Sequence, residues 1–375
     1  MSYIEDNRNI DSFIENLSKS RRNTFNIAYK QFGLFTNESW NKDSETVFSD
    51  VAKYCKNERN NDKFYVLLNQ FAQWLLVDHP DILITMGNKQ SKYQKPLKAK
   101  HPESVRHYIG VLVQFFEDQY KIETSRSILK KRITLPTVEE EDPEPFTKDE
   151  VKMFIDHSSA DRKVLYMTLK DSGMRIGETC QLRKSDIDTT QNPIQINIKA
   201  KYTKEKKAHS TFVTNETKPM LLKRLAEIED NDLVFGTNED VDTAVNNEEQ
   251  CFYYLREKLG MLEKYSHNGR YKKTLHSFRS YCATQASRAL DENWAHALLG
   301  HKQYLQQYIR NQDDYAKFYK RTEPHLMIYE KVVVVDSDDR VRMMQEQMNE
   351  LIKTVGKLER ERQELAELEM IKSQL

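Results

Sequence analysis

The sequence predicts a mainly helical protein with one small β-sheet, divided into two folded regions that are followed by a coiled-coil helix. Apolar residues recur at helical spacing in both halves of the chain. Two short stretches, 194–198 and 210–214, have the pattern of paired strands. A proline-rich acidic segment at 136–146 separates the halves. At 375 residues the chain has enough material for about two or three domains.

Residues 1–135 are predicted to form a helical domain with basic outer faces. Its first helix is indicated by apolar residues three and four apart, namely Ile10, Phe13, Ile14 and Leu17. A strong helix is expected over 105–116. The lysines before this helix are candidate DNA contacts, although a run of charges is also typical of a solvated loop. They are Lys92, Lys95, Lys98 and Lys100.

The charges of the chain balance overall but not locally. Its 58 Lys and Arg residues match 58 Asp and Glu residues, so the net charge gives no sign of a nucleic-acid partner. Between residues 88 and 135, however, 11 basic residues stand against 4 acidic ones. Phosphate contacts depend on such local patches and not on the isoelectric point. The first domain is therefore a candidate DNA-binding domain.

The segment 136–146 is expected to be an exposed linker, because its prolines cannot extend a helix. Thr147 then fits the N-cap of a new helix, with an acid three residues later. A second domain is predicted to begin there and to cover 147–332. Within it, 163–172 has the pattern of a buried helix, and Gly173 is predicted to stop that helix.

Scattered basic residues of the second domain fit metal-free attack on a phosphodiester. Arg175 follows the predicted helix stop, His276 and Arg279 are three apart and so share a helix face, and His301 comes later. Arginine forks match phosphate oxygens, and histidines can share those bonds or take the proton of an attacking hydroxyl. Glu178 is expected to support Arg175, a purely structural ion pair being the alternative. Covalent attack by a tyrosine stores the bond energy, so no metal, nucleotide or other cofactor is expected.

Three stretches resemble the tyrosine recombinase (phage integrase) superfamily, whose signature is Arg, Lys, His-x-x-Arg, His and Tyr in that order. They are 169–178, 275–284 and 298–302. Segment 307–328 is similar to integrases of archaeal mobile elements. The resemblance implies a helical, SAM-like core-binding domain on DNA and a mixed α/β catalytic domain.

By this resemblance, Arg175 and Arg279 hold the phosphoryl oxygens. His276 and His301 complete the site. The general acid is a lysine in the hairpin between the paired strands, and Lys201 aligns with it. Two further lysines of the hairpin are candidate DNA contacts, the first of them also the main rival for the acid: Lys204 and Lys207.

The attacking tyrosine is left open between several residues. The usual position of this tyrosine in the family falls here on Arg310. Tyr308 is the nearest tyrosine and the first candidate, if the loop before it is shortened. A longer loop favours Tyr315, which could then be delivered to a neighbouring subunit, and Tyr319 and Tyr304 are further rivals.

The implied function is that of a site-specific DNA recombinase or integrase working through a covalent 3′-phosphotyrosine. Its expected partners are double-stranded DNA attachment sites, other copies of the chain in a tetramer on DNA, and accessory DNA-bending proteins. Two alternatives remain open. A type IB topoisomerase-like enzyme would relax DNA with nearly the same residues, and a catalytically lapsed DNA-binding protein would explain the missing tyrosine at the usual position.

Residues 336–375 have the pattern of a coiled-coil helix. Apolar residues alternate three and four apart for about three heptads. The seam residues are Val341, Met344, Met348, Leu351, Val355, Leu358 and Leu365. Self-association of this helix is favoured over a single helix folded back on the catalytic domain.

The remaining composition is that expected of a cytoplasmic protein that joins the nucleoid when it binds DNA. The four cysteines are dispersed and show no metal-ligand spacing, as is usual for reduced cysteines inside cells. No apolar run is long enough to span a bilayer, and the first residues lack the pattern of a signal peptide.

Overall fold

The computed structural model describes residues 10–87, 92–137, 142–236, 238–301 and 313–329. The chain divides into two compact units, each with its own core. The first comprises residues 1–143 together with 264–271, and the second comprises 144–263 and 272–375. The boundary between the units at 143–144 lies inside the predicted linker. The assignment of DNA binding to the first domain and catalysis to the second stays a prediction. The predicted coiled coil and Tyr308 lie outside the described residues.

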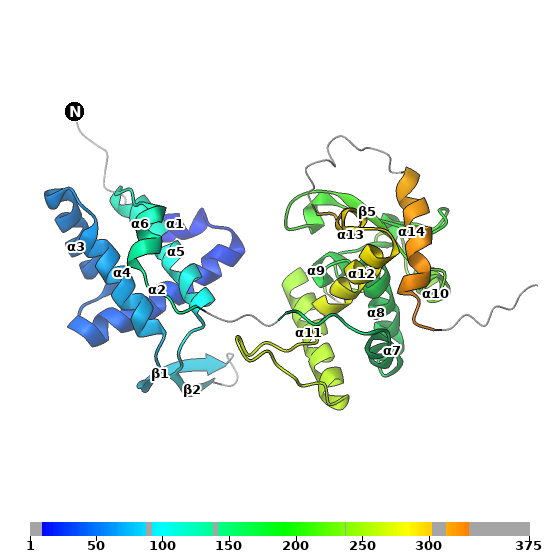
Figure 1. Ribbon diagram of the computed structural model, residues 1–375, viewed down its shortest axis with the longest axis horizontal. Coiled ribbons are helices and arrows are strands. Elements are labelled where there is room, and N and C mark those ends of the chain that lie inside the picture. Colours follow the sequence, from blue (N-terminus) through cyan, green and yellow to red (C-terminus); the bar gives the residue numbers. More distant parts are fainter. Residues whose placement is uncertain (1–9, 88–91, 138–141, 237, 302–312, 330–375) are drawn as a thin grey trace, which may run out of the picture. The chain divides into compact units, whose positions relative to one another are not determined.

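The first unit is a helical bundle around an aromatic core, with a β-hairpin at one end (Figure 1). Phe64 and Phe116 stack with ring centroids 3.7 Å apart, and Phe32 stacks on Phe48 at 4.5 Å. Asp43 caps a helix by accepting a hydrogen bond from the Thr46 N–H at 2.8 Å. The helices are α1 (Ile10–Glu15), α2 (Lys19–Trp40), α3 (Ser44–Glu58), α4 (Asp62–Leu75), α5 (Pro102–Tyr120) and α6 (Arg126–Arg132).

The hairpin of the first unit was not predicted from the sequence. Strands β1 (His79–Gly87) and β2 (Lys92–Leu97) pair antiparallel, with Ile84 opposite Lys95. The side chains of residues 79–85 on β1 are all partly or fully exposed, and Leu83 is 54% exposed. Because none of these β1 side chains is fully buried, the sequence of β1 lacks the contrast of apolar and polar residues that marks a strand.

The second unit is mainly helical with a three-stranded antiparallel sheet in the order β3-β4-β5. Helix α12 packs against α8, α13 and α14, and it carries the His-x-x-Arg pair (Figure 1). The elements are α7 (Lys148–Asp156), α8 (Ala160–Ser172), α9 (Ile176–Thr179), η1 (Lys184–Asp186), β3 (Ile187–Asp188), β4 (Gln195–Ile198), η2 (Ala200–Tyr202), β5 (His209–Phe212), α10 (Lys218–Ala226), α11 (Val241–Lys258), α12 (His276–Ala289), α13 (Glu292–Leu298) and α14 (Asp313–Leu326).

Several local predictions for this unit are confirmed. Thr147 and Glu150 form a reciprocal capping box at the start of α7. Gly173 ends α8 in the left-handed conformation, with φ of 63°. The two predicted strands pair as β4 and β5, with Ile196 opposite Thr211. The fold is thus mainly helical with small antiparallel sheets, as the sequence indicates.

A buried ionic cluster joins the end of α8 to two distant segments. Lys170 and Asp171 have no exposed surface, and the Lys170 amine lies 2.5 Å from Asp171 Oδ1 and 3.0 Å from Glu216 Oε2. The amine also donates to the carbonyl of Leu326 at 3.1 Å. Glu216 Oε1 accepts the backbone N–H of Tyr329 at 2.7 Å. The cluster therefore fastens the end of α14 to the helix that precedes Arg175.

Asp171 is satisfied from the other side by the turn between β5 and α10. Its Oδ2 accepts the Thr214 backbone N–H at 3.0 Å and the Thr214 hydroxyl at 2.7 Å, and the Thr217 hydroxyl donates to the same oxygen. Buried charges are tolerated only when they are paired and hydrogen-bonded in this way.

Replacing Lys170 with methionine is expected to destabilise the second unit by about 3 to 5 kcal/mol, because Asp171 and Glu216 would keep buried charges without their cation. The measurement is the urea dependence of hydrogen exchange in peptides from α8 and α14 of the full chain. The matched control is Lys317→Ala, which removes an ion pair to Asp314 whose lysine side chain is 75% exposed. This control should change the free energy of unfolding by less than about 1 kcal/mol. Equal losses in both variants would contradict the role of the cluster.

Candidate active site

Arg175 is positioned by a tight passage between α8 and α9. The chain turns at Gly173, where an added Cβ would lie 2.4 Å from Leu299 Cδ2 and 3.1 Å from Cys282 Sγ. Arg175 then serves as the residue before α9, and its backbone N–H donates to Glu178 Oε2 at 2.8 Å. Its Nη1 donates to Glu178 Oε1 at 2.9 Å. Glu178 therefore orients Arg175, whose side chain remains 33% exposed and can meet a ligand.

Arg279 is the buried cation of the site. It is 4% exposed, and its guanidinium donates to the carbonyl of Gly173 at 2.5 Å and to that of Leu299 at 2.9 Å. Burial, followed by the positive charge of Arg175, lowers the pKa of Arg279 to about 10. The guanidinium is still protonated at neutral pH. The structure thus brings together the two arginines that the sequence separates by about a hundred positions.

His301 lies against Arg279. Gly300 ends the turn after α13 with φ of 70°, and the His301 backbone N–H donates to the carbonyl of His296 at 3.0 Å. The His301 Nε2 lies 2.9 Å from Arg279 Nη2. Burial and the charge of Arg279 lower the pKa of His301, so the ring is neutral at neutral pH.

His276 opens α12 and remains accessible to solvent. Its surroundings displace enough water to lower its pKa, and the charges of Arg279 and Arg175 lower it further. The cluster therefore places neutral imidazoles beside two cations. An anion such as a phosphodiester is the ligand that this charge pattern favours.

His209 belongs to the same cluster and was not predicted. It begins β5, and a Cβ on Gly300 would lie 2.6 Å from its ring, so the two residues are in close contact. Burial lowers the pKa of His209; Glu178 opposes this effect, and Arg279 adds to it. The sequence gives no motif for it, and only the pairing of β5 with β4 carries this histidine to the site.

The lysine hairpin between β4 and β5 comes close to the cluster through its turn. Glu205 is near enough to raise the pKa of both Arg279 and His301 against the larger lowering effects. Lys201 lies in η2, is exposed, and has its amine 5.4 Å from the centroid of the Tyr202 ring. Lys204 is also exposed. Neither lysine has a hydrogen bond to the arginines or histidines of the site among the described contacts, so the choice of acid stays a prediction.

The candidate tyrosines differ sharply in their surroundings. Tyr319 has no exposed surface, and its hydroxyl donates to the carbonyl of Asp171 at 3.1 Å. Burial raises the pKa of Tyr319 well above its usual value. Tyr315 is half-buried and packs edge-on against Trp294, with ring centroids 5.6 Å apart. Burial also raises the pKa of Tyr315. Tyr308 and Tyr304 fall in 302–312, outside the described residues.

The lysines proposed to bind DNA in the first unit have mixed surroundings. Lys98 forms an exposed ion pair with Asp78 at 2.9 Å. Lys95 is exposed on β2, whereas Lys100 is partly buried and has its pKa lowered by burial and by Lys95. Lys92 lies on β2, opposite Gly87 in the pairing. These residues supply positive charge to the hairpin, and their contact with DNA stays a prediction.

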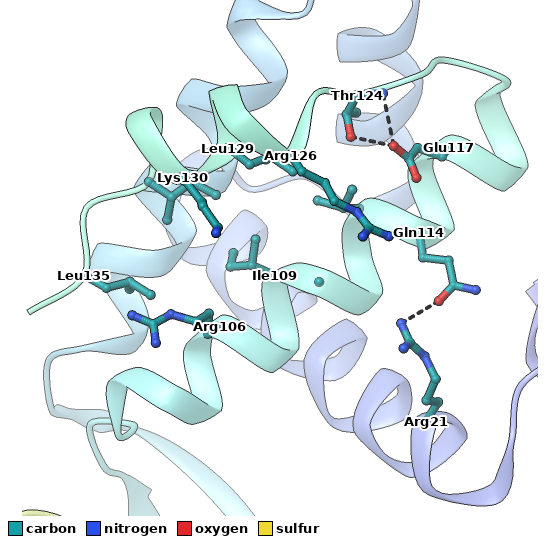
Figure 2. A pocket seen from close by; sticks show the side chains of 13 residues that line it. Arg21, Arg106, Ile109, Gln114, Glu117, Thr124, Arg126, Leu129, Lys130 and Leu135 are labelled. Carbon is teal, nitrogen blue, oxygen red and sulfur yellow. Dashed lines mark hydrogen bonds between the residues drawn. The ribbon is translucent and has the colours of Figure 1, made fainter. Parts of the chain in front are cut away.

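The first unit carries a cationic groove, of which the sequence predicts the positive charge over 88–135 but not the hollow. Its volume is about 1240 Å³, and it lies along α5 and α6, with Arg21 of α2 at its edge (Figure 2). The floor is apolar, and Figure 2 shows Arg106, Arg126 and Lys130 around Ile109. Arg21 reaches across to Gln114 Oε1 at 2.6 Å. Arg106, Arg126 and Lys130 belong to the basic stretch 88–135, whereas Arg21 is brought beside them from α2 by helix packing.

Comparison with known proteins gives a match for most of the second unit. Residues 144–315 match the phage integrase family. This range includes both arginines, the histidine cluster, the lysine hairpin and the segment that holds Tyr308. It also ends at Tyr315, before Tyr319.

Solved structures with similar folds include two recombinases and an integrase. XerA recombinase is 19% identical, covers 91% of this chain and 99% of its own, and has a TM-score of 0.36. XerH, bound to a palindromic difH substrate, is 15% identical over 84% of this chain and 80% of its own, with a TM-score of 0.47. A lambda integrase dimer bound to a core site is 16% identical, covers 56% of this chain and 76% of its own, and has a TM-score of 0.42. Because these identities and TM-scores are low, the likeness to a family is carried by residues 144–315.

Stability of the second unit is expected to fall as pH falls below about 6.5. His209, His276 and His301 all have lowered pKa values in the folded state. At acidic pH the unfolded chain therefore binds more protons than the folded chain. The free energy of unfolding has its highest value above the ordinary histidine pKa and declines below it. Urea unfolding at a series of pH values measures this slope.

The variant His276→Gln should flatten the slope, since it removes one of the groups that the folded state keeps neutral. His157→Gln is the matched control, because His157 is an exposed histidine at the end of α7. If His276→Gln leaves the pH dependence of the free energy of unfolding unchanged, then folding does not disfavour the protonated form of His276.

Proposed function

We propose that the chain is a tyrosine-type site-specific recombinase of the phage integrase family, which its residues 144–315 match, and that it cleaves and rejoins DNA through a covalent 3′-phosphotyrosine. The observation that carries this proposal is the cluster of Arg175, Arg279 and neutral histidines in one site. Such a cluster offers positive charge and hydrogen bonds to the oxygens of an attacked phosphate.

The two arginines take complementary parts in this proposal. Arg175 is held by Glu178 but remains accessible, so its free donors can meet one phosphoryl oxygen. Arg279 is buried and fixed by two carbonyls, which orients its remaining donors without a large entropy cost. The charge that develops at phosphorus is then stabilised by groups that are already in place.

Tyr308 is the proposed nucleophile. It would attack the scissile phosphate, form a 3′-phosphotyrosyl bond and release a 5′ hydroxyl. The surroundings of the other candidate tyrosines support this choice. Tyr319 would have to leave the core and give up its hydrogen bond to the carbonyl of Asp171. Tyr315 would have to leave its packing on Trp294. Attack on the phosphotyrosine by a 5′ hydroxyl from the partner duplex then reverses the step and exchanges strands.

A lysine of the hairpin is the proposed general acid for the departing 5′ oxygen. Lys201 is the first candidate and Lys204 the second, since both are exposed near a turn that approaches Arg279 and His301. Lys207 would contact DNA phosphates nearby. His276 would share the phosphate's hydrogen bonds.

The proposed substrate is double-stranded DNA that carries attachment sites. The first unit would supply sequence-independent phosphate contacts from its basic hairpin and from the cations at the rim of its groove. Four subunits would gather on two sites, with accessory DNA-bending proteins as further partners and the nucleoid as the place of action. No helix in the described part of the chain is long and apolar enough to cross a membrane.

Relaxation of DNA in the manner of a type IB topoisomerase is the second candidate activity, and a lapsed DNA-binding protein is the third. The buried Arg279 argues against a lapsed site, because a guanidinium with no ligand to stabilise costs free energy to bury. Dependence on a paired second duplex would separate recombination from relaxation.

Trapping on a nicked suicide duplex is expected to give a covalent protein–DNA adduct. The nick removes the 5′ hydroxyl that would reverse the reaction, so the phosphotyrosine accumulates. Tyr308→Phe should abolish the adduct, while Tyr315→Phe should retain it, and peptide mapping should locate the modified tyrosine at Tyr308. An adduct that persists in Tyr308→Phe would assign the nucleophile elsewhere. DNA binding without any adduct would favour the lapsed protein.

A substrate with a sulfur in place of the 5′ bridging oxygen is expected to rescue the loss of the general acid. Lys201→Ala should cleave the ordinary duplex about a hundredfold or more slowly. It should cleave the sulfur-bridged duplex at nearly the normal rate, because a thiol with a pKa of about 8.5 leaves without a proton. Rates of adduct formation measure both.

Two controls sharpen this experiment. Lys204→Ala should lose little on either substrate if Lys201 is the acid, and the pattern would be exchanged if Lys204 is. Arg279→Lys should be slow on both substrates, because a lysine cannot reproduce the fork that stabilises the phosphorus centre. Slow cleavage of the sulfur-bridged duplex by both lysine variants would exclude the hairpin as the source of the proton.

A further inference from the structure

A second histidine lies directly behind His301. His296, on α13, has its Nδ1 at 3.0 Å from His301 Nδ1, and the two ring centroids are 5.3 Å apart. The other ring nitrogen of His301, Nε2, lies 2.9 Å from Arg279 Nη2. Both nitrogens of His301 therefore have a partner, one in the core and one on an exposed residue.

These contacts fix which nitrogen of His301 carries the proton. A guanidinium has donors and no acceptor, so His301 Nε2 must accept from Arg279. A neutral imidazole has a single N–H, which is then on His301 Nδ1. That N–H donates to His296 Nδ1, and the proton of His296 is therefore on its Nε2. The hydrogen bonds run in one direction, from Arg279 through His301 to His296.

The backbone holds the pair in this geometry. His301 N–H donates to the carbonyl of His296 at 3.0 Å, which closes the turn at the end of α13. Gly300 between them has φ of 70° and contacts the ring of His209, where no larger residue would fit. The two rings are thus placed by a short turn and not by chance contact of long side chains.

We propose that His296 is a positioning residue for the reaction, holding His301 in the Nδ1–H tautomer so that its Nε2 lone pair faces Arg279 and the phosphate site. This inference rests on the proposed function for its catalytic consequence, but the tautomer is a property of the free protein. Arg279 favours the same tautomer by donating to Nε2, and the acceptor at His296 adds to this preference. Without that acceptor the Nδ1–H form of His301 loses a hydrogen bond, and the Nε2–H form gains population.

The tautomer decides what His301 can do. With its lone pair at Nε2, the ring can accept the hydroxyl proton of the attacking tyrosine in place of the hydrogen bond from Arg279, while the Arg279 guanidinium keeps its bonds to the carbonyls of Gly173 and Leu299. The imidazolium so formed carries its Nδ1 proton against His296, whose own Nε2 proton can pass to solvent as the Nδ1 proton arrives. One proton leaves the tyrosine and one reaches water, so the balance is kept.

Several other groups face the pair and must be kept constant in any test. Arg279 comes from α12, Arg175 from the start of α9, Glu205 from the lysine hairpin and His209 from β5. The two arginines disfavour a charged His301, and Glu205 favours it. Substitution of His296 leaves all four in place, which makes it a specific probe.

The first test measures the tautomer directly in the full chain without DNA. Histidine labelled with ¹⁵N shows by its ring nitrogen shifts which nitrogen of His301 is protonated, and His301→Gln assigns the signals. Wild type is expected to show the Nδ1–H form. His296→Ala should move His301 toward the Nε2–H form, and His296→Asn should restore Nδ1–H, because its amide oxygen can accept in place of Nδ1. His157→Ala is the exposed control.

The second test measures adduct formation on the suicide duplex. His296→Ala should slow it about tenfold with unchanged DNA binding, and His296→Asn should recover most of the rate. An Nε2–H form in wild type, or a His301 tautomer that is indifferent to His296→Ala, would overturn the proposal. So would equal slowing by the alanine and asparagine variants. Absence of any adduct in wild type would instead reject the proposed function, while the nitrogen shifts would still decide the tautomer.

Discussion

The buried guanidinium of Arg279 is the contact on which the rest of the second unit depends. It joins α12 to the end of α8 and to the turn after α13, since it donates to the carbonyls of Gly173 and Leu299 and to the ring of His301. Each of these acceptors is neutral. The cation is therefore held in place without being neutralised, and its charge remains available to an anion that enters the site. Burial of this charge, together with the nearby charge of Arg175, lowers the pKa of Arg279 to about 10.

The neighbouring groups are arranged to tolerate this cation. Glu178 binds Arg175, so only part of the positive charge of the pair is uncompensated. The histidines are kept neutral by burial and by the arginines, which avoids further repulsion. Behind them the ionic cluster of Lys170, Asp171 and Glu216 fixes α8, and with it the turn that presents Arg175. The site is thus prepared for an anion by rigid supports and not by the flexibility of its own side chains.

Much of this arrangement could be predicted from the sequence because its signals are local. The capping box at Thr147 and the left-handed Gly173 are fixed by neighbouring residues, and both are confirmed. The spacing of His276 and Arg279 on one helix is of the same kind. His209 and the shape of the cationic groove could not be found in this way, because strand pairing and helix packing bring their residues together over long distances. The β1–β2 hairpin escaped prediction for a different reason, namely that residues 79–85 of β1 are all at least partly exposed.

The attachment of Tyr329 has a mechanical consequence. Its backbone N–H is bound by Glu216, its hydroxyl donates to Asp156 of α7, and the preceding N–H of Ile328 also bonds to Glu216. A force applied to the chain beyond this point would be borne first by these contacts. Through Lys170 the load would pass to α8, whose end sets the path of the backbone toward Arg175. Tyr329 and Glu216 therefore form an anchor. A pull on the residues after Tyr329 would load this anchor before it could displace α14.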